Sequence, residues 1–343
     1  MSLVTGAWTL EDLKNERIGF KKNNLKVFSC FHCGGGSTMG YKLAGFDVIG
    51  GNEIDKDMMA IYRANHNPKH SYLMPIQEFK NIPNQDLPKE LFELDVLDGS
   101  PPCSSFSMAG SREKKWGSAH AFREGQAVQH LDDLFFDYID VAEKLKPKVV
   151  VAENVKGLIQ GNARGYVKQI FTQFNKIGYS VQLFLLNASR MGVPQARERT
   201  FFIANRLEKK IKLEFNESII PLKHAIKDVV PTGKTNISEL ALSLWEKCEP
   251  GKSFSSVHEK GSWFNWSRLH QNFPTPTLIS TSCKMMIHPS EPRSLGDNEL
   301  VRIQSFPDDY NFLDQEPGYV LGMSVPPLMM QRIAHQIHIQ LLS

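Results

Sequence analysis

The sequence of 343 residues lacks any long apolar run. No stretch approaches the roughly 20 apolar residues that a membrane-spanning helix needs. Residues 1–24 contain no apolar signal core, so nothing there marks the chain for export. We therefore expect a cytoplasmic protein with no membrane contact.

Cysteine is scarce, and its number is odd. Five cysteines argue against a complete disulfide framework and favour a reducing compartment. Cys30 and Cys33 form a C-x-x-C pair, but Cys103, Cys248 and Cys283 are scattered and no second pair follows. A zinc site would lack ligands, so we expect no metal and interpret the pair as small buried apolar residues. The net charge of +3 permits a polyanionic partner without requiring one.

A regular alternation of strand-like and helix-like segments fills the first two hundred residues. Apolar runs predict strands at 26–31, 46–54, 93–100, 148–155, 179–188 and 199–206. Spacings of three and four predict helices at 37–45, 56–65, 131–145 and 167–178. This order predicts an α/β fold with a doubly wound, mostly parallel, Rossmann-like sheet.

The alternation stops after Arg206. Residues 206–292 are loop-rich and mildly basic, and they hold Trp245, Trp263 and Trp266. We expect two domains: a large one at 1–205, completed by a C-terminal helical part at 317–343, and a small loop-rich one at 206–316.

Three glycines mark the turn between the first predicted strand and the first predicted helix. Gly34, Gly35 and Gly36 would let a ligand approach the backbone next to the helix N-terminus. Glu53 closes the second predicted strand, about 20 residues on, where an acidic side chain can bind ribose hydroxyls. Tight turns also need glycine, but together with Glu53 the pattern predicts a nucleoside cofactor.

The segment DVLDGSPPCSSFS places a thiol at the end of another buried strand. Pro101 and Pro102 stiffen the backbone on which Cys103 sits, at the sheet edge where ligands bind. A buried structural cysteine is the common alternative, and the two prolines argue against it.

From about Val27 to its C-terminus, the chain resembles the C5-cytosine methyltransferases that use S-adenosylmethionine. FHCGGGSTMGYKLAGF and GNEID are similar to the family's cofactor loop and ribose-binding segment. GSPPCSSFS, AENV and QARERTFFIA resemble its PCQ, ENV and QxRxR motifs. RSLGDNELVRIQSFPDDY and GYVLGMSVPP are similar to its last two motifs, and all seven segments stand in the family's order.

The resemblance implies the roles of the catalytic residues. Cys103 would attack C6 of a cytosine that has been flipped out of the duplex. Glu153 would hydrogen-bond N3 and the exocyclic amine of the base. Arg197 and Arg199, two apart in an extended segment, would hold the O2 atom of the base, the target phosphate and the catalytic loop; surface charge pairing is the alternative. Further substrate contacts would come from Ser104, Asn154, Gln195 and Arg268, although Asn154 is better placed to brace the loop.

For S-adenosylmethionine and its product S-adenosylhomocysteine, the resemblance implies contacts with Phe31, Gly34, Gly35, Gly36, Glu53, Ile54, Pro102 and Leu134. Leu134 lies on an apolar helical face, so ordinary core packing explains it equally well. Several positions depart from the family pattern: His32 and Cys33 replace small residues, Pro75 an aspartate, Ser104 a glutamine and Met323 an asparagine. These departures bear on cofactor affinity more than on the reaction.

We therefore expect a monomeric DNA (cytosine-5-)-methyltransferase acting on double-stranded DNA in the cytoplasm, at the nucleoid. A solitary bacterial or phage enzyme and one paired with a separately encoded restriction endonuclease both fit. The alternatives are an RNA methyltransferase of similar fold, whose branch usually carries PPCQ, and a non-catalytic DNA-binding relative. The small domain would recognise the target, with Arg268 on a phosphate; the three tryptophans fit either DNA contact or the core of that domain.

Overall fold

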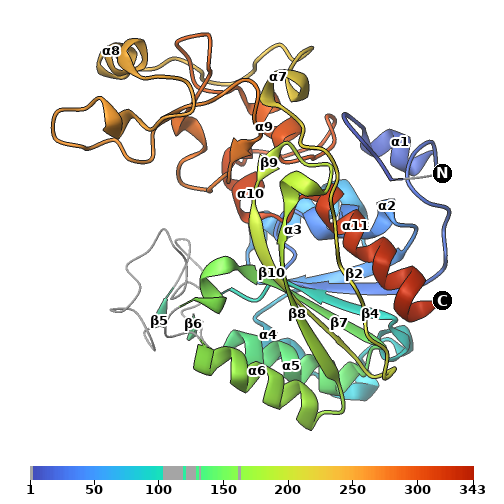
Figure 1. Cartoon of the computed structure of the whole chain (residues 1–343). Helices are drawn as coiled ribbons and strands as arrows, with labels where there is room; N and C mark the ends of the chain where they lie inside the picture. The colour runs from blue at the N-terminus through green and yellow to red at the C-terminus, as the bar shows by residue number, and fades with distance from the viewer. Residues whose placement is uncertain (1–2, 103–118, 121–128, 131–132, 161–163) are drawn as a thin grey trace.

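The computed structural model describes residues 3–102, 119–120, 129–130, 133–160 and 164–343 (Figure 1). A seven-stranded sheet with the order β3-β2-β1-β4-β7-β10-β8 forms its centre. The strands are β1 (Lys26–Cys30), β2 (Asp47–Glu53), β3 (His70–Leu73), β4 (Val96–Gly99), β7 (Val149–Val155), β8 (Ser180–Asn187) and β10 (Glu198–Asn205). The pairs from β3 to β7 are parallel, and β10 runs antiparallel to both of its neighbours. The predicted fold class is confirmed.

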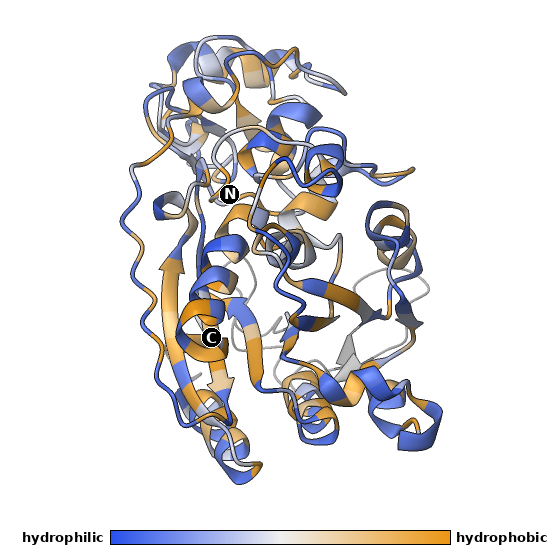
Figure 2. Ribbon diagram, turned by 90° about the vertical axis from the view of Figure 1, so that its right-hand side faces the viewer, coloured by the Kyte–Doolittle hydropathy of each residue, from blue (hydrophilic) through white to orange (hydrophobic). Residues whose placement is uncertain are grey.

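Helices cover both faces of this sheet (Figure 1). On one face lie α2 (Gly36–Leu43), α3 (Lys56–His66) and α11 (Pro327–Ile337); on the other lie α4 (Ile76–Asn81), α5 (Leu134–Leu145) and α6 (Arg164–Lys176). Successive residues of a strand face opposite ways, so Val150 and Val151 enter different cores. Figure 2 shows hydrophobic residues gathered in the strands and alternating with hydrophilic ones along the helices.

Local sequence explains where these helices begin and end. The Asp55 side chain caps α3 by accepting from the backbone N–H groups of Asp57 and Met58. Lys146, in the left-handed region at φ 52°, closes α5. Pro147 follows and cannot continue the helix. The helix predicted for 131–145 is therefore found as Leu134–Leu145, and residues 131–132 lie outside the described residues.

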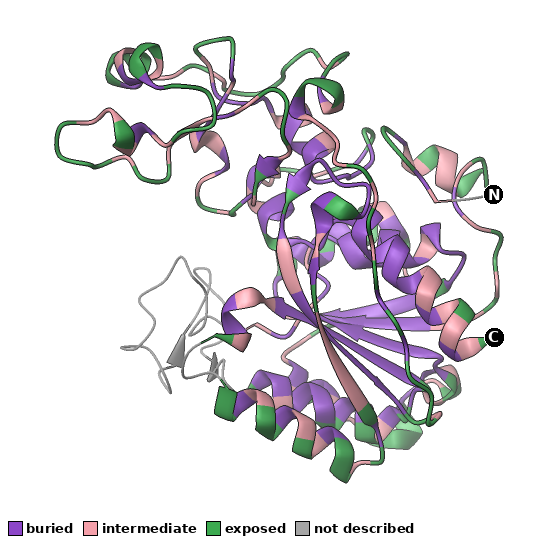
Figure 3. Ribbon diagram, viewed as in Figure 1, coloured by how far each residue is buried: buried purple, intermediate pink, exposed green. Residues whose placement is uncertain are grey.

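The second half of the chain adds a smaller unit above the carboxyl edge of the sheet (Figure 1). Its elements are short: α7 (Leu222–Ala225), α8 (Glu239–Lys247), α9 (Asp297–Ile303), α10 (Pro317–Met323), β11 (Ser267–Arg268), β12 (Thr275–Pro276) and β13 (Met286–Ile287). Trp245, Trp263 and Trp266 pack against its small core around Phe254. All three tryptophans therefore pack against this core, as the core interpretation expects, while each stays partly exposed. Figure 3 shows far fewer buried residues here than in the sheet.

Residues 207–217 run along β8, although the sequence pattern predicts them in the small domain. The amide of Gln182 exchanges hydrogen bonds with the backbone of Ile211, and Glu217 binds Arg332 of α11. This segment therefore packs with the large unit. We propose that the small unit begins after it.

The remaining elements are short. They are α1 (Leu10–Lys14), β5 (Ala119–His120), β6 (Gln129–His130) and β9 (Gln195–Ala196), the 3-10 helices η1 (Asn84–Asp86), η2 (Lys89–Glu93), η4 (Lys156–Ile159), η6 (Ala188–Arg190), η7 (Phe254–Ser256) and η8 (Cys283–Met285), and the π-helical turn η9 (His338–Leu342). Among the described residues, none of the helices has the length and apolarity to cross a membrane.

Candidate active site

Several of the predicted site residues lie at one edge of the sheet. The parallel strands β1, β2, β4 and β7 end there, and the strand order reverses between β1 and β4. In open α/β sheets, ligands bind in the crevice at such a reversal. Phe31, Glu53, Pro102 and Glu153 all lie at the ends of these strands.

The glycines are required by the packing of the chain against itself. Gly35 begins α2 with φ at 75°, a conformation that L residues rarely adopt. A Cβ on Gly35 would lie 2.2 Å from Nε2 of His66, and one on Gly36 would lie 2.0 Å from the Val325 carbonyl oxygen. Space for a ligand is therefore not the only reason for glycine at these positions.

Glu53 joins β2 to the glycine loop, which is defined here as residues 31–36. Its Oε2 accepts from the Cys33 N–H at 3.0 Å, and its Oε1 accepts from Ile54 and Asp55 at 2.8 and 3.0 Å. A carboxylate has about four lone-pair positions, so one remains for a ligand hydroxyl. Burial raises the pKa of this carboxyl group. The side chain thus both holds the loop and keeps the acceptor capacity that a ribose would use.

The apolar cofactor candidates surround the same edge. Phe31, with φ at 53°, packs beside Tyr138 at a ring-centroid distance of 6.4 Å. Ile54 and Pro102 are half-buried. Leu134 is 1% exposed and belongs to the core beneath the sheet, so the packing alternative describes its contacts in this structure.

Glu153 and Arg199 form an ion pair at the end of β7. Arg199 Nε lies 3.0 Å from Glu153 Oε1. The antiparallel pairing of β10 with β7 brings the two residues together, since Arg199 stands opposite Val155 and Phe201 opposite Glu153. The side chain of Glu153 is mostly buried, so its orientation is set by this arginine.

Asn154 braces the segment that leads to Cys103. Its Nδ2 donates to the Pro101 carbonyl at 3.0 Å, while its Oδ1 accepts from Val155 N–H at 2.9 Å. The bracing role expected from the sequence therefore matches the geometry. Cys103 and Ser104 themselves lie outside the described residues.

Arg197 does not share the partner of Arg199. Its side chain is 2% exposed and donates to the carbonyls of Leu278 and Gly322 at 3.0 and 3.1 Å. Gln195 is fully buried, accepts from Leu278 N–H at 3.0 Å and donates to Gln304. Both residues thus tie the segment before β10 to the small unit and to α10, rather than facing an open crevice.

Arg268 holds the small unit together. It donates to the carbonyls of Pro289, Trp245 and Cys248 at 2.9, 3.2 and 2.9 Å, and its guanidinium lies 4.1 Å from the Trp245 ring centroid. The expected phosphate contact stays a prediction, and the contacts described here are internal.

The departures from the family pattern are accommodated locally. His32 is buried and stacks on Tyr62 at 3.7 Å, and burial lowers its pKa to about 4. Cys30 is buried, as expected, but Cys33 is only partly so, beside the sulfur of Met58. Pro75 begins α4. Met323 is largely exposed at the end of α10.

Two buried groups near this edge were not singled out from the sequence. Asp98 of β4 is 1% exposed, and its Oδ2 accepts from Ser29 Oγ at 2.7 Å. Burial raises its pKa to about 7. An aspartate inside an apolar strand was a visible signal. Tyr310 donates to the Gly34 carbonyl. No signal in the sequence marks this contact, because the two residues are 276 positions apart.

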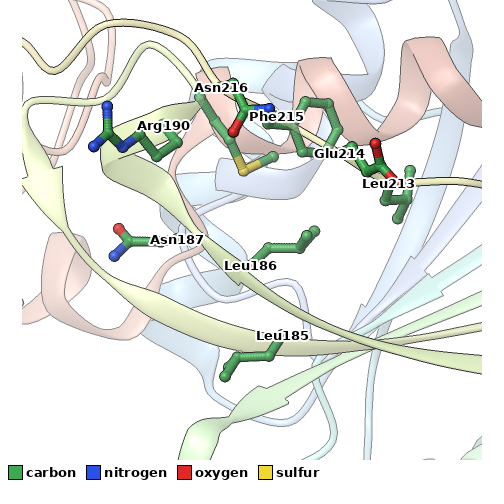
Figure 4. Close-up of a pocket in the computed structure, with 9 residues that line it drawn as sticks. Leu185, Leu186, Asn187, Arg190, Leu213, Glu214, Phe215 and Asn216 are labelled. Carbon is green, nitrogen blue, oxygen red and sulfur yellow. The ribbon is translucent and has the colours of Figure 1, made fainter.

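No group of three or more histidines, cysteines, aspartates or glutamates in the described part of the chain could hold a metal. A cavity of about 320 Å³ lies elsewhere, between β8 and residues 213–216 (Figure 4). Leu186, Arg190 and Phe215 are among its lining residues, and none of the candidate site residues lines it.

Comparisons with known proteins bear on this arrangement. The model of the family described as C-5 cytosine-specific DNA methylase matches residues 25–338. Type II methyltransferase M.NgoPII of Neisseria gonorrhoeae is 29% identical in an alignment 356 residues long, which covers 92% of this chain and 96% of that protein. Type II methyltransferase M.FnuDI of Fusobacterium nucleatum is 29% identical, with 91% and 94% covered.

A solved structure of a putative DNA modification methyltransferase encoded within an E. coli prophage superposes with a TM-score of 0.73. It is 20% identical, and the match covers 93% of this chain and 100% of that one. The S. pombe Dnmt2 methyltransferase gives a TM-score of 0.62 at 14% identity, covering 93% and 99%. At such identities these two matches speak for the fold alone.

Proposed function

The chain belongs to the family of C-5 cytosine-specific DNA methylases, and we propose that it methylates C5 of a flipped-out cytosine with S-adenosylmethionine as donor and Cys103 as nucleophile. The observation that carries the assignment of residues is the Glu153–Arg199 pair, 3.0 Å apart, next to the Asn154 brace on Pro101. These contacts support a role for Glu153, because its neighbour Asn154 holds the segment that leads to Cys103.

Cys103 would form a bond from its sulfur to C6 of the base. A free thiol has a pKa of about 8.5, so the thiolate must be favoured by the loop. The electron pair of the C5–C6 double bond moves toward C5, which takes up the methyl group. Loss of the C5 proton then returns the pair and releases the cysteine. The Asn154 contact supports this role, because a nucleophile must be held at a defined distance.

Glu153 would hydrogen-bond N3 and the exocyclic amine and stabilise the charge that builds on the base as sulfur adds. Arg199 fixes the carboxyl group through Nε. Arg197 and Gln195 would act indirectly, by holding Leu278 of the small unit against the site.

The residues at the carboxyl edge fit the cofactor that the family implies. Glu53 keeps one lone-pair position for a ribose hydroxyl. Phe31, Ile54 and Pro102 offer half-buried apolar surface beside it. When bound, S-adenosylmethionine supplies an electrophilic methyl group on a sulfonium and leaves as S-adenosylhomocysteine.

The substrate would be double-stranded DNA. Relatives named Type II methyltransferases support a place in a restriction–modification system, with the cognate endonuclease on a separate chain. We propose a monomer that meets its DNA in the cytoplasm.

Transfer of labelled methyl groups from S-adenosylmethionine to duplex DNA and to tRNA tests the proposal. We expect label in DNA, located on cytosine after hydrolysis, and none for Cys103→Ser. Label in tRNA alone would overturn the substrate, and turnover by Cys103→Ser above about a hundredth of wild type, a smaller loss than one catalytic interaction often causes, would overturn the nucleophile.

A further inference from the structure

The residues before position 25 lie outside the family match, yet some of them are packed into the fold. Val4 and Trp8 are buried, and Trp8 is only 3% exposed. Val4 N–H donates to Gln331 of α11, and its carbonyl accepts from Arg332. The N-terminal segment, defined here as residues 4–14, is therefore fixed on α11 (Figure 1).

The same segment binds a second element, the aromatic turn of residues 305–312. Trp8 Nε1 donates to the Ser305 carbonyl at 3.0 Å, and the Trp8 carbonyl accepts from Asp308 N–H at 2.9 Å. The Asp309 carboxylate caps α1 by accepting from Leu10 and Glu11 at 2.6 and 3.2 Å. The N-terminal segment and the aromatic turn therefore hold each other in place.

The aromatic turn also contacts the glycine loop. Tyr310 is buried, packs against Phe306 at a ring-centroid distance of 5.0 Å and donates its hydroxyl hydrogen to the Gly34 carbonyl. Asn311 exchanges hydrogen bonds of 2.8 and 2.9 Å with Asn65 of α3. The turn is thus held on α3 as well as on the glycine loop.

The glycine loop needs such an external hold. Phe31 and Cys33 both have positive φ, at 53° and 48°. Residues in this region persist only where the surroundings enforce them. The loop carries Phe31, and Cys33 N–H is the donor to Glu53. A shift of the loop would therefore move both Phe31 and the Cys33 N–H that holds Glu53, which are expected on the two sides of the ribose.

We propose that the N-terminal segment is a positioning element for the cofactor: it fixes the aromatic turn, and Tyr310 then fixes the glycine loop through the Gly34 carbonyl. Trp8 and Tyr310 are positioning residues that touch no reacting atom. The inference rests on the proposed function, in which this loop binds S-adenosylmethionine.

Calorimetric binding of S-adenosylhomocysteine to the full chain tests it. Tyr310→Phe removes only the hydroxyl, whereas Trp8→Phe removes the indole N–H together with part of the ring system and leaves a smaller aromatic ring. We expect Kd to rise about 3- to 10-fold for Tyr310→Phe, the size of one net hydrogen bond, and about 2- to 5-fold for Trp8→Phe. Turnover at saturating cofactor should stay near wild type.

Two matched variants control for lost stability. Tyr179→Phe removes another buried tyrosine bond to a carbonyl, that of Pro147, at the opposite end of the strands. Trp245→Phe removes another indole bond to a carbonyl, also 3.0 Å long, inside the small unit. Both should leave Kd for S-adenosylhomocysteine unchanged.

The double variant Trp8→Phe/Tyr310→Phe decides whether the two residues act in series. If they do, its Kd equals that of Tyr310→Phe alone. Wild-type Kd in all variants, or two independent effects that multiply, would overturn the inference. A wild-type protein that binds no S-adenosylhomocysteine would instead contradict the proposed function.

Discussion

At the scale of single residues, Glu153 has the surroundings that bear most directly on the reaction. Its carboxyl group is mostly buried and forms an ion pair with Arg199 at 3.0 Å. A carboxylate held in this way has a defined orientation, and the contribution of Arg199 should appear in turnover rather than in cofactor binding.

Arg199→Ala should lower kcat by up to about 100-fold, the cost of misplacing a catalytic group by about 1 Å. The Kd for S-adenosylhomocysteine should not change. Lys156→Ala is the matched control, since Lys156 pairs with Glu198 at 2.8 Å on the neighbouring surface. Exposed pairs of that kind contribute little, and equal losses in both variants would contradict the role of Arg199.

Asp98 gives a second residue-scale prediction, on stability against pH. Its pKa is raised by burial from the usual 3.8 to about 7. Between these values the unfolded chain ionises Asp98 while the folded chain keeps it protonated, so stability falls as pH rises through this window. Wild-type Tm should therefore drop by more between pH 4 and pH 8 than the Tm of Asp98→Asn. Parallel Tm profiles would show that Asp98 is ionised in the fold.

At the scale of elements, the junction of β1 with α2 is built from contacts that leave no room for a side chain. His66 of α3 and Val325 between α10 and α11 both lie where the Cβ atoms of Gly35 and Gly36 would stand. The glycine loop is thus shaped by α3 and by the segment between α10 and α11.

Gly35→Ala should destabilise the protein by about 1–2 kcal/mol through the left-handed backbone alone, and further through the clash with His66. Adding His66→Ala should restore part of the loss, because it removes the clash but not the strain. Gly165→Ala, in α6 with nothing within 4 Å, is the control and should be neutral or slightly stabilising. Chemical denaturation measures all of these variants, and an unchanged stability for Gly35→Ala would refute this account of the loop.

At the scale of the whole molecule, the sheet unit holds the candidate chemistry and the small unit lies over its carboxyl edge. Buried contacts from Arg197 and Gln195 to Leu278 join the two units. Base-edge contacts specify a sequence, whereas phosphate contacts only position the protein. Target choice should therefore follow the small unit while the reaction stays with the sheet.

Variants of Arg268 test whether the small unit takes part in DNA binding. If the Arg268 guanidinium mainly binds the three carbonyls, Arg268→Lys should lower Tm and DNA affinity nearly as much as Arg268→Ala. The reason is that the ammonium group of lysine cannot reproduce the planar set of N–H donors of a guanidinium. A phosphate contact would instead be rescued by lysine, and its loss in Arg268→Ala would make the salt dependence of binding shallower by about one unit. Binding titrations over a range of salt, together with melting curves, separate the two.

The sequence by itself determined the sheet, the order of the motifs and the family. The periodicity of apolar residues is local, and residues 26–31, 46–54 and 148–155 carried it clearly enough to be found as β1, β2 and β7. The position of Glu53 at the end of β2 followed from the same pattern. The sequence does not decide between the two roles of Leu134, since a helical face does not reveal what covers it.

Only the tertiary structure decided what the long-range partners are. Tyr310 meets Gly34, Trp8 meets Ser305, and Arg268 meets the carbonyls of its own unit. Neither charge nor spacing along the chain encodes these pairs, because they arise when α11, the aromatic turn and the small unit pack on the sheet. Hydrogen bonds between groups hundreds of residues apart depend on that packing. The close contacts of Gly35 and Gly36 depend on it too, whereas the sequence alone suggested a tight turn or a ligand.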